Sequence, residues 1–483
     1  MPSAAGSGSN PDEAIDLSLL GDVPAWLRSL RLHKYTPNFE HSHWKDMVML
    51  DDAGLEAKGV GALGARRKLL KVFETVRGKM GMPSMPGDGA GSTKDAGSVS
   101  MLFATALLAA SIAAPVFSSP VPAEKRWAFS QYFDLQAHRG GRGHVVENTL
   151  PAFADSLNNG VTSLEMDVGL TKDGHLIVWH DEQIDPLKCQ DTIPVATDDP
   201  IFPYVGKYLA NLTLAQVKTL DCGSVRLDGF PLAVTVPGTK LATLEEMFDF
   251  VACATDAPVL FNIESKVDGD FHNLTRSPED FMEALTAVYK PMGCAMLDRI
   301  THQSFDWRML VLSKIAMPEL RTSALCSDAN LWKPLGPGRY GNLTTHGSGP
   351  SNWLAGIDID SFPGTVGEKV ALAAHSIKAD FLSPSATSAA STASDVGMSG
   401  YIPFTTKAMV DKAHLLGLQV KPWTTNRLNQ IDFLVNEVGV DGLITDFPRD
   451  VRLWAIQQGL NVAPLGNENR VKQCLKKHNQ LTQ

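Results

Sequence analysis

The second half of the chain alternates short apolar segments with longer amphipathic stretches. The apolar segments are rich in Val, Ile, Leu and Phe and have the length of buried strands. Because these segments alternate with helix-like stretches, we expect an α/β fold with a parallel sheet covered by helices. Seven or eight strands favour a closed (β/α)8 TIM barrel over a doubly wound sheet, and no glycine-rich dinucleotide motif follows the first strand. The predicted strands lie at residues 134–139, 163–168, 259–266, 299–305, 379–385, 418–425 and 442–448, in a domain of residues 129–462.

Residues 14–82 have a different pattern, with apolar positions at helical spacing. Val23, Trp26 and Leu27 follow Asp22, which can cap a helix, and Pro24 falls in the first turn. Four or five short helices, the last one longer, predict a small all-α bundle. Residues 1–13 and 83–100 are rich in Gly, Ser and Pro, so we expect a disordered start and a flexible linker, with a C-terminal tail at residues 463–483.

An internal segment at residues 101–126 is similar to a secretion signal. Leu102 to Ala114 carry no charge, and a small residue, Ala123, and a dibasic pair follow. The run is shorter than the ~20 residues that a membrane span needs, and it suits the apolar core of a signal peptide. No transmembrane anchor is expected. The segment lacks the usual basic start, and a buried helix in a linker is the alternative.

Composition separates the two parts of the chain. The 483 residues exceed one ordinary domain, and 44% hydrophobic with 20% charged residues indicates a globular protein. The net charge is -10, yet residues 14–82 hold 11 basic against 8 acidic side chains. All six cysteines follow residue 101, as do the glycosylation motifs at Asn211, Asn273 and Asn342. These features favour an oxidising compartment; Cys189 with Cys222 is the preferred disulfide, and six free thiols are the alternative.

Polar side chains gather at the C-terminal ends of three predicted strands, where a barrel builds its active site. Two carboxylates lie two residues apart in the second strand, so both project from one face. The third strand repeats this spacing with a carboxylate and a lysine. The residues are His138, Arg139, Glu165, Asp167, Glu264 and Lys266.

The three carboxylates would repel one another in a barrel mouth unless a cation lay between them. All-oxygen ligation favours a hard divalent ion, Mg²⁺ or Ca²⁺. Arg139 and Lys266 suit an anionic substrate. His138 and His180 can exchange protons near neutral pH. Together these groups predict a phosphodiester-cleaving site, although each residue alone could be a cap, a turn residue or a surface ion pair.

Six motifs of this half together resemble the glycerophosphodiester phosphodiesterase family: AHRGGRGHVVENTLPAF, SLEMDVGLTKDGHLIVWHDEQ, NIESK, HQSF, VKPWTTN and GLITDFP. The resemblance implies metal-dependent hydrolysis of glycerophosphodiesters to sn-glycerol 3-phosphate and an alcohol. It also implies that a glycerol hydroxyl attacks phosphorus before water opens the cyclic phosphate. A barrel phospholipase of the sphingomyelinase D kind, which stops at the cyclic product, is the alternative.

The same resemblance implies a role for each matching residue. The metal ligands are Glu165, Asp167 and Glu264, the acid–base pair is His138 and His180, and the phosphate contacts are Arg139 and Lys266. Supporting residues are Glu147, Asn148 and Trp423. Residues 185–243 match an inserted segment of the family, which we expect to set the preference for the leaving alcohol.

The N-terminal block resembles the SAM (sterile alpha motif) domain of the Smaug type, whose members bind RNA hairpin loops. The stretches LRLHKY and GALGARRKLLK carry the resemblance. A glycine turn before a basic helix also offers free N–H groups and positive charge to a phosphate backbone. The alternatives are a SAM domain that binds protein and a solvated basic helix. The resemblance implies an RNA surface of Leu32, Lys34, Tyr35, Ala62, Leu63, Gly64, Arg67 and Lys68.

The two parts predict opposite locations, because an RNA-binding domain works in the cytoplasm whereas the barrel has the features of an exported enzyme. We therefore expect that the chain joins two neighbouring genes, with a secreted enzyme if translation starts near Met101. A cytoplasmic bifunctional protein, translated from Met1, is the alternative. An RNA-binding regulator is the second function class.

Overall fold

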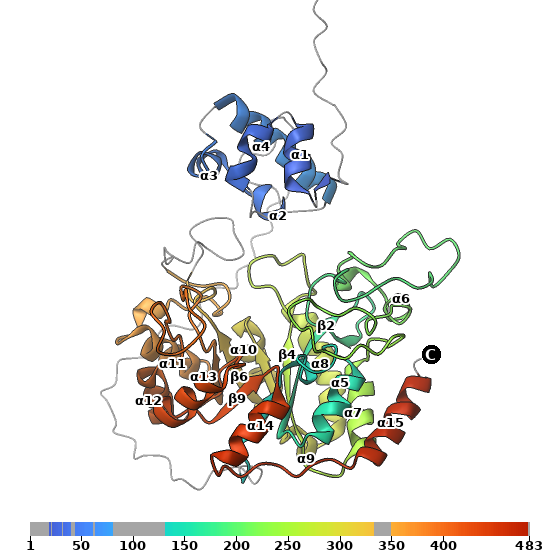
Figure 1. The fold of residues 1–483 in the computed structure, drawn as a ribbon, viewed down its shortest axis with the longest axis vertical. Helices are drawn as coiled ribbons and strands as arrows, with labels where there is room; N and C mark the ends of the chain where they lie inside the picture. Colours follow the sequence, from blue (N-terminus) through green and yellow to red (C-terminus); the bar gives the residue numbers. More distant parts are fainter. Residues whose placement is uncertain are drawn as a thin grey trace, which may run out of the picture. The chain divides into compact units, whose positions relative to one another are not determined.

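The computed structural model describes residues 19–20, 22–30, 32–39, 44–60, 63–80, 131–332 and 349–481 (Figure 1). The chain divides into two compact units, a helical one in the N-terminal part and a larger one that holds the sheet. The internal signal-like segment, the linker and residues 1–13 lie outside the described residues. In the part of the chain that is described, no helix combines the length and the apolar character that crossing a membrane requires.

The N-terminal unit is a bundle of short helices around one apolar core, as the helical spacing predicts. Trp26, Phe39 and Phe73 are fully buried in this core. Asp22 Oδ1 accepts from Ala25 N at 2.9 Å and caps the first helix, which confirms its predicted role. The helices are α1 (Val23–Ser29), η2 (His33–Phe39), α2 (Trp44–Met47), α3 (Asp52–Ala57) and α4 (Leu63–Met80).

Within its described residues, the larger unit contains eight parallel strands and one short antiparallel strand, β3, that pairs with β2. The parallel strands follow the order β8-β7-β6-β5-β4-β2-β1-β9. Asp441 N donates to Val420 O at 2.9 Å and Ile444 N donates to Pro422 O at 3.0 Å, so the last strand returns to the end of β8. The barrel is therefore nearly closed. The strands are β1 (Asp134–Ala137), β2 (Ser163–Leu170), β3 (Leu176–Val178), β4 (Leu260–Ser265), β5 (Ile300–Ser304), β6 (Arg321–Cys326), β7 (Phe381–Pro384), β8 (Gln419–Val420) and β9 (Gly442–Thr445).

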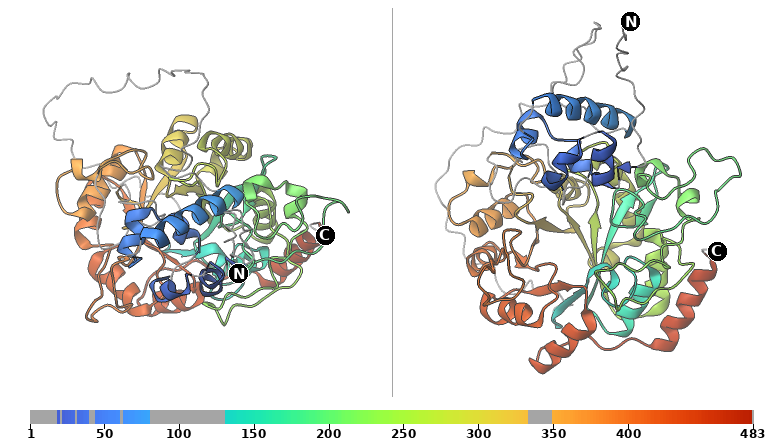
Figure 2. Two further views of the ribbon diagram at one scale, coloured as in Figure 1. Left: turned by 90° about the horizontal axis from the view of Figure 1, so that it is seen from above. Right: turned by 45° about the horizontal axis from the view of Figure 1, so that its top comes forward.

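Helices surround the strands, as Figures 1 and 2 show. Several begin at a threonine whose hydroxyl accepts from a backbone N–H inside the first turn; Thr243 and Thr365 do so within full capping boxes. The helices are α5 (Leu150–Asn158), α7 (Leu244–Ala254), α8 (Pro278–Tyr289), α9 (Cys294–Leu297), α10 (Trp307–Ala316), α11 (Val366–Ser376), α12 (Lys407–Leu415), α13 (Leu428–Asp432) and α14 (Pro448–Gln457).

The seven strands predicted from apolar runs all exist, which confirms the barrel, but the prediction missed β6 and the short antiparallel β3. The sequence of β6, RTSALC, starts with Arg, Thr and Ser, so it has no apolar run to detect. All six of its residues are nevertheless buried, because both neighbours, β5 and β7, and the covering helices exclude water from it. Burial of this strand is thus set by its place in the barrel.

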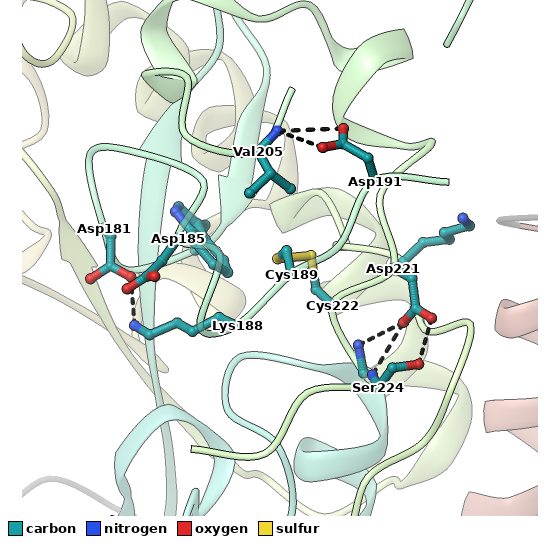
Figure 3. The surroundings of a disulfide bond; sticks show 12 residues. Asp181, Asp185, Lys188, Cys189, Asp191, Val205, Asp221, Cys222 and Ser224 are labelled. Atoms are coloured by element: carbon teal, nitrogen blue, oxygen red, sulfur yellow. Dashed lines mark hydrogen bonds and ion pairs between the residues drawn. A yellow bond between two sulfur atoms is a disulfide. The ribbon is translucent and has the colours of Figure 1, made fainter. Parts of the chain in front are cut away.

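The inserted segment, residues 185–243, forms a small layer with its own apolar core. Tyr204, Leu212 and Val217 are fully buried in this core. The segment includes η5 (Leu209–Asn211) and α6 (Leu214–Val217). A disulfide joins Cys189 to Cys222, which confirms the preferred pairing (Figure 3).

A helix, α15 (Glu468–Leu481), occupies most of residues 463–483, which were predicted to be a C-terminal tail. Val471 and Cys474 lie in the main core, and α15 packs against α7 and α5. A second disulfide, which the sequence did not predict, joins Cys253 of α7 to Cys474. Of the remaining two cysteines, Cys294 is exposed and Cys326 is buried. The C-terminal residues are thus part of the barrel unit.

Candidate active site

Three buried carboxylates meet at the C-terminal ends of β2 and β4. The register places Asp167 directly beside Glu264, with Glu165 one pleat earlier on the same strand. One oxygen of each residue lies within 4.8 Å of the others. This is the predicted metal-ligand set, brought together by two neighbouring strands.

The cluster has the free donors that a divalent cation requires. Asp167 Oδ1 is buried and, among the described residues, has no hydrogen-bond partner. It lies 3.9 Å from Lys266 Nζ. Glu165 is already oriented, since its Oε2 accepts from Arg139 N at 2.7 Å and its Oε1 from Gln303 Nε2 at 2.7 Å. These acidic oxygen donors fit Mg²⁺ or Ca²⁺.

The electrostatics of the cluster reflect crowding of negative charge in a buried place. Burial, and then the charge of Asp167, raises the pKa of Glu165 well above its ordinary value. Burial raises the pKa of Glu264 to about 7, although Lys266 opposes this shift. Burial alone would raise the pKa of Asp167, but neighbouring cations hold the pKa below its ordinary value. Those cations are His180 when protonated, Arg139 and Lys266.

A strained turn after β1 places Arg139 against the cluster. Arg139 has φ 52° and Asn148 has φ 54°, both in the left-handed region that residues other than glycine rarely adopt. The Asn148 backbone N–H donates to Arg139 O at 2.9 Å, and its side-chain Nδ2 donates to Asp167 Oδ2 at 2.9 Å. Within this turn, the Asn148 side chain therefore fixes Asp167, and the Arg139 backbone N–H fixes Glu165.

Both predicted histidines have a carboxylate partner at Nδ1. His138 Nδ1 lies 2.6 Å from Asp446 Oδ1, and His180 Nδ1 lies 2.7 Å from Asp181 Oδ1. Burial lowers the pKa of His138, and it lowers the pKa of His180 further. Burial thus disfavours the charged form of each ring, whereas the carboxylate at Nδ1 orients the ring and leaves Nε2 for proton transfer.

Glu147 pairs with three cations on one side of the site. Arg139 Nη1 donates to Glu147 Oε1 at 3.0 Å, Arg142 Nη1 lies 3.2 Å from Oε2, and Lys188 Nζ lies 2.8 Å from Oε1. Burial disfavours the charged form of Glu147, but the three cations hold its pKa well below the ordinary value. Glu147 therefore remains an anion and keeps Arg139 in place.

Lys266 lies beside the carboxylate cluster and near two aromatic rings. Lys266 Nζ lies 2.7 Å from Glu264 Oε1 and 5.8 Å from the centre of the Phe305 ring. Phe305 meets Trp423 edge-on, with ring centres 5.2 Å apart, and Trp423 Nε1 donates to Ser383 O at 2.9 Å. Trp423 thus packs against Phe305, behind Lys266.

A cavity lies between this site and the inserted segment. Arg142, Glu147 and Lys188 form its polar wall, and Val225, Leu227 and Phe230 are among the apolar residues of the segment that line it. Arg142 Cζ lies 4.6 Å from the centre of the Phe230 ring. The cavity therefore joins charged site residues to an apolar surface.

Five residues that contact the predicted site residues were missed from the sequence: Arg142, Asp181, Lys188, Gln303 and Asp446. Asp181, Gln303 and Asp446 lie within motifs that were already recognised, and Asp446 directly follows β9. The rule that polar residues at strand ends form the site could have found Asp446. Lys188 gave no such signal, because it lies in the inserted segment.

The predicted RNA-binding residues fall in two parts of the helical unit. Lys34 is exposed, with Nζ 4.8 Å from the centre of the Tyr35 ring. Leu32 and Tyr35 are largely buried in the core, and Lys68 Nζ donates to Leu30 O at 2.9 Å. Leu63, Gly64 and Arg67 lie on α4, and Ala62 lies outside the described residues.

An eight-stranded barrel whose mouth holds a buried carboxylate cluster, two oriented histidines and several cations defines a barrel enzyme for an anionic substrate. The model of the glycerophosphoryl diester phosphodiesterase family matches residues 138–450. The chain belongs to this family, and its barrel is a glycerophosphodiester phosphodiesterase domain. A solved structure from Silicibacter pomeroyi DSS-3 that carries the same family name is 25% identical, with a TM-score of 0.51 over 69% of this chain and 96% of that one.

The model of the SAM domain (sterile alpha motif) matches residues 15–77. Over this part, the chain is 72% identical across 71 residues to the RNA-binding protein VTS1 of Mycosarcoma maydis. It is 65% identical across 69 residues to that of Yarrowia lipolytica. These matches cover 15% and 14% of this chain but only 10% and 16% of the two relatives.

Replacing Asp167 tests the carboxylate cluster. Asp167→Asn keeps the shape of the side chain but removes a charge at the orphaned oxygen. We expect Mg²⁺ and Ca²⁺ to bind at least ~10-fold more weakly, as measured by calorimetry. The exposed Glu283→Gln on α8 is the matched control. Unchanged affinity in Asp167→Asn would contradict the assignment.

Proposed function

We propose that the barrel hydrolyses glycerophosphodiesters in a reaction that depends on a divalent cation and yields sn-glycerol 3-phosphate and an alcohol. The observation that carries this proposal is the carboxylate cluster, set between two carboxylate-oriented histidines and the cations Arg139 and Lys266. A bound cation would neutralise the cluster and stabilise negative charge on the phosphate. Glu165, Asp167 and Glu264 would hold it.

The chain's own residues would bind the phosphate and move protons. Arg139 and Lys266 flank the cluster and would bind the phosphate oxygens. One histidine would accept the proton of the attacking glycerol hydroxyl, and the other would donate a proton to the leaving alcohol. When water opens the cyclic phosphate, each histidine would perform the reverse transfer and return to its starting state. Asp446 and Asp181 would stabilise whichever ring is protonated.

A small cavity beside the site marks the side on which we propose that the leaving alcohol lies. Its polar wall includes Glu147, which contacts Arg139, and its apolar wall belongs to the inserted segment. This segment would therefore contact the alcohol while the barrel residues contact the phosphate. The family comparison supports the hydrolytic reaction over the cyclising, sphingomyelinase D-like one.

The full-length protein tests this proposal with glycerophosphocholine and glycerophosphoethanolamine. We expect release of glycerol 3-phosphate that stops with EDTA and returns with Mg²⁺ or Ca²⁺. Glu264→Gln should lower kcat by at least ~100-fold, since it removes a charge from the cluster. Accumulation of a cyclic phosphate instead of glycerol 3-phosphate would favour the cyclising reaction.

A second activity, RNA hairpin binding, is proposed for the helical unit. The identity of 72% to the RNA-binding protein VTS1 of Mycosarcoma maydis supports it. Because the chain covers little of that relative, the proposal concerns this unit alone. Lys34 is exposed and available to a phosphate backbone.

Substituting Lys34 tests hairpin binding. Lys34→Ala should weaken binding several-fold and reduce the slope of log K against log salt by about 1, because one phosphate contact is lost. Lys58→Ala removes another exposed lysine outside the predicted surface and should change binding less. Fluorescence anisotropy with a labelled hairpin measures both. Equal losses in the two variants would indicate non-specific attraction.

We also propose that the barrel matures in an oxidising compartment. Two disulfides support this proposal, as do the exposed positions of Asn211 and Asn273 in their glycosylation motifs. Asn342 lies outside the described residues. The cytoplasmic function proposed for the helical unit conflicts with this location, as expected if the two parts are made as separate proteins.

The native protein, isolated from the cells that make it, tests the compartment. We expect a drop in mass on treatment with a glycan-removing amidase. After denaturation but before reduction, we expect two alkylatable thiols per barrel, those of Cys294 and the buried Cys326. A single unglycosylated polypeptide of 52.2 kDa with six alkylatable thiols would show that the joined cytoplasmic chain is the real product.

A further inference from the structure

The inserted segment supplies one cation to the active site, Lys188. Its Nζ lies 2.8 Å from Glu147 Oε1 and 2.5 Å from Asp181 Oδ2. Its side chain is only 11% exposed, so the ammonium group is largely withdrawn from water. Nζ also lies 5.5 Å from the centre of the Trp179 ring. Lys188 therefore has a fixed place between two carboxylates.

Each of these two carboxylates also contacts a residue that takes part in the proposed reaction. Asp181 Oδ1 lies 2.7 Å from His180 Nδ1, and Glu147 Oε1 accepts from Arg139 Nη1 at 3.0 Å. Lys188 thus connects the histidine and the phosphate-binding arginine through one carboxylate each.

Without the lysine charge, two carboxylates that now share one ammonium group would repel each other. Glu147 would remain fixed, because it still pairs with Arg139 and Arg142. Asp181 is more exposed and has no other cation in the described contacts, so it would turn towards water. The His180 ring would then lose the acceptor that orients it.

The disulfide of the inserted segment fixes the backbone of Lys188. Lys188 N and Cys189 N donate to Asp185 O at 3.0 and 2.9 Å and form a tight turn. Cys189 bonds to Cys222, and Gln190 and Asp221 exchange backbone hydrogen bonds of 2.9 and 3.0 Å beside it. Lys188 directly precedes the disulfide-bonded Cys189, and Figure 3 shows its side chain extending to Asp181.

We propose that Lys188 is a positioning residue that orients the Asp181–His180 pair, and that the Cys189–Cys222 disulfide holds Lys188 in place for this purpose. The inference rests on the proposed function of the barrel. It makes the inserted segment part of the acid–base machinery as well as a wall of the cavity.

Kinetics of full-length variants test the role of Lys188. Lys188→Met should lower kcat by about 10- to 100-fold with little change in KM, because a misplaced acid–base group slows the chemical step. Lys188→Arg keeps the charge and should restore most of kcat. Lys207→Met, an exposed lysine of the same segment, is the control and should match the unaltered protein.

A double-mutant cycle separates positioning from direct contact with substrate. In an Asp181→Asn background, Lys188→Met should change kcat less than twofold, since the partner through which it acts is already lost. Independent, multiplicative effects together with a raised KM would show that Lys188 binds the phosphate directly, and would overturn the proposal.

The two disulfides provide a matched pair of variants. Cys189→Ser/Cys222→Ser should lower kcat in the unaltered protein but have little further effect in Lys188→Met. Cys253→Ser/Cys474→Ser removes the other disulfide, which lies at the C-terminal end of α7, before the start of β4. This double variant should lower the unfolding temperature and leave kcat unchanged. Equal losses of kcat from both pairs would contradict a specific role for Cys189–Cys222.

A measurement independent of turnover keeps this inference apart from the proposed function. The Nδ1 proton of His180, assigned by comparison with His180→Gln, should give a strongly shifted NMR signal that Lys188→Met loses and Lys188→Arg keeps. If the protein hydrolyses no glycerophosphodiester, the proposed reaction fails, and this signal still decides the role of Lys188. An unchanged signal in Lys188→Met would overturn it.

Discussion

Mutual repulsion of three buried carboxylates is the constraint on which the barrel mouth depends. The neighbouring strands β2 and β4 bring Glu165, Asp167 and Glu264 within 4.8 Å of one another, where water cannot screen their charges. The surrounding groups reduce this repulsion. Arg139 turns through a strained backbone so that its N–H faces one carboxylate, Lys266 pairs with another, and a cation would satisfy the orphaned oxygen of Asp167.

The barrel interior could be predicted where local sequence alone determines it. Apolar runs located seven strands, and the i, i+2 spacing of Glu165 and Asp167 placed both on one face. Strand β6 was missed because its burial comes from its neighbours rather than from its composition. The pair His138–Asp446 shows the same distinction: each residue stands at a strand end in the sequence, but their pairing across 308 residues depends on the return of β9 to β1.

The two units are stabilised in different ways. The helical unit relies on one apolar core of aromatic and aliphatic side chains, and its residues lie close together in sequence. The barrel unit adds two disulfides to two apolar clusters and a separate core in the inserted segment. This difference explains why the cysteine distribution divided the chain correctly, although it did not reveal that the C-terminal residues belong to the barrel.

Strand β1 pairs with both β2 and β9. Of the strands that follow β1, β2 is synthesised first and β9 last. During synthesis, the β2 side of β1 is covered early, while the other side waits for residues 442–445. A nascent barrel thus carries an open backbone edge until residues 442–445 have left the ribosome, and such an edge is where chains associate wrongly. Only then can Cys474 reach Cys253, so oxidation of this pair marks the completion of the barrel rather than its beginning.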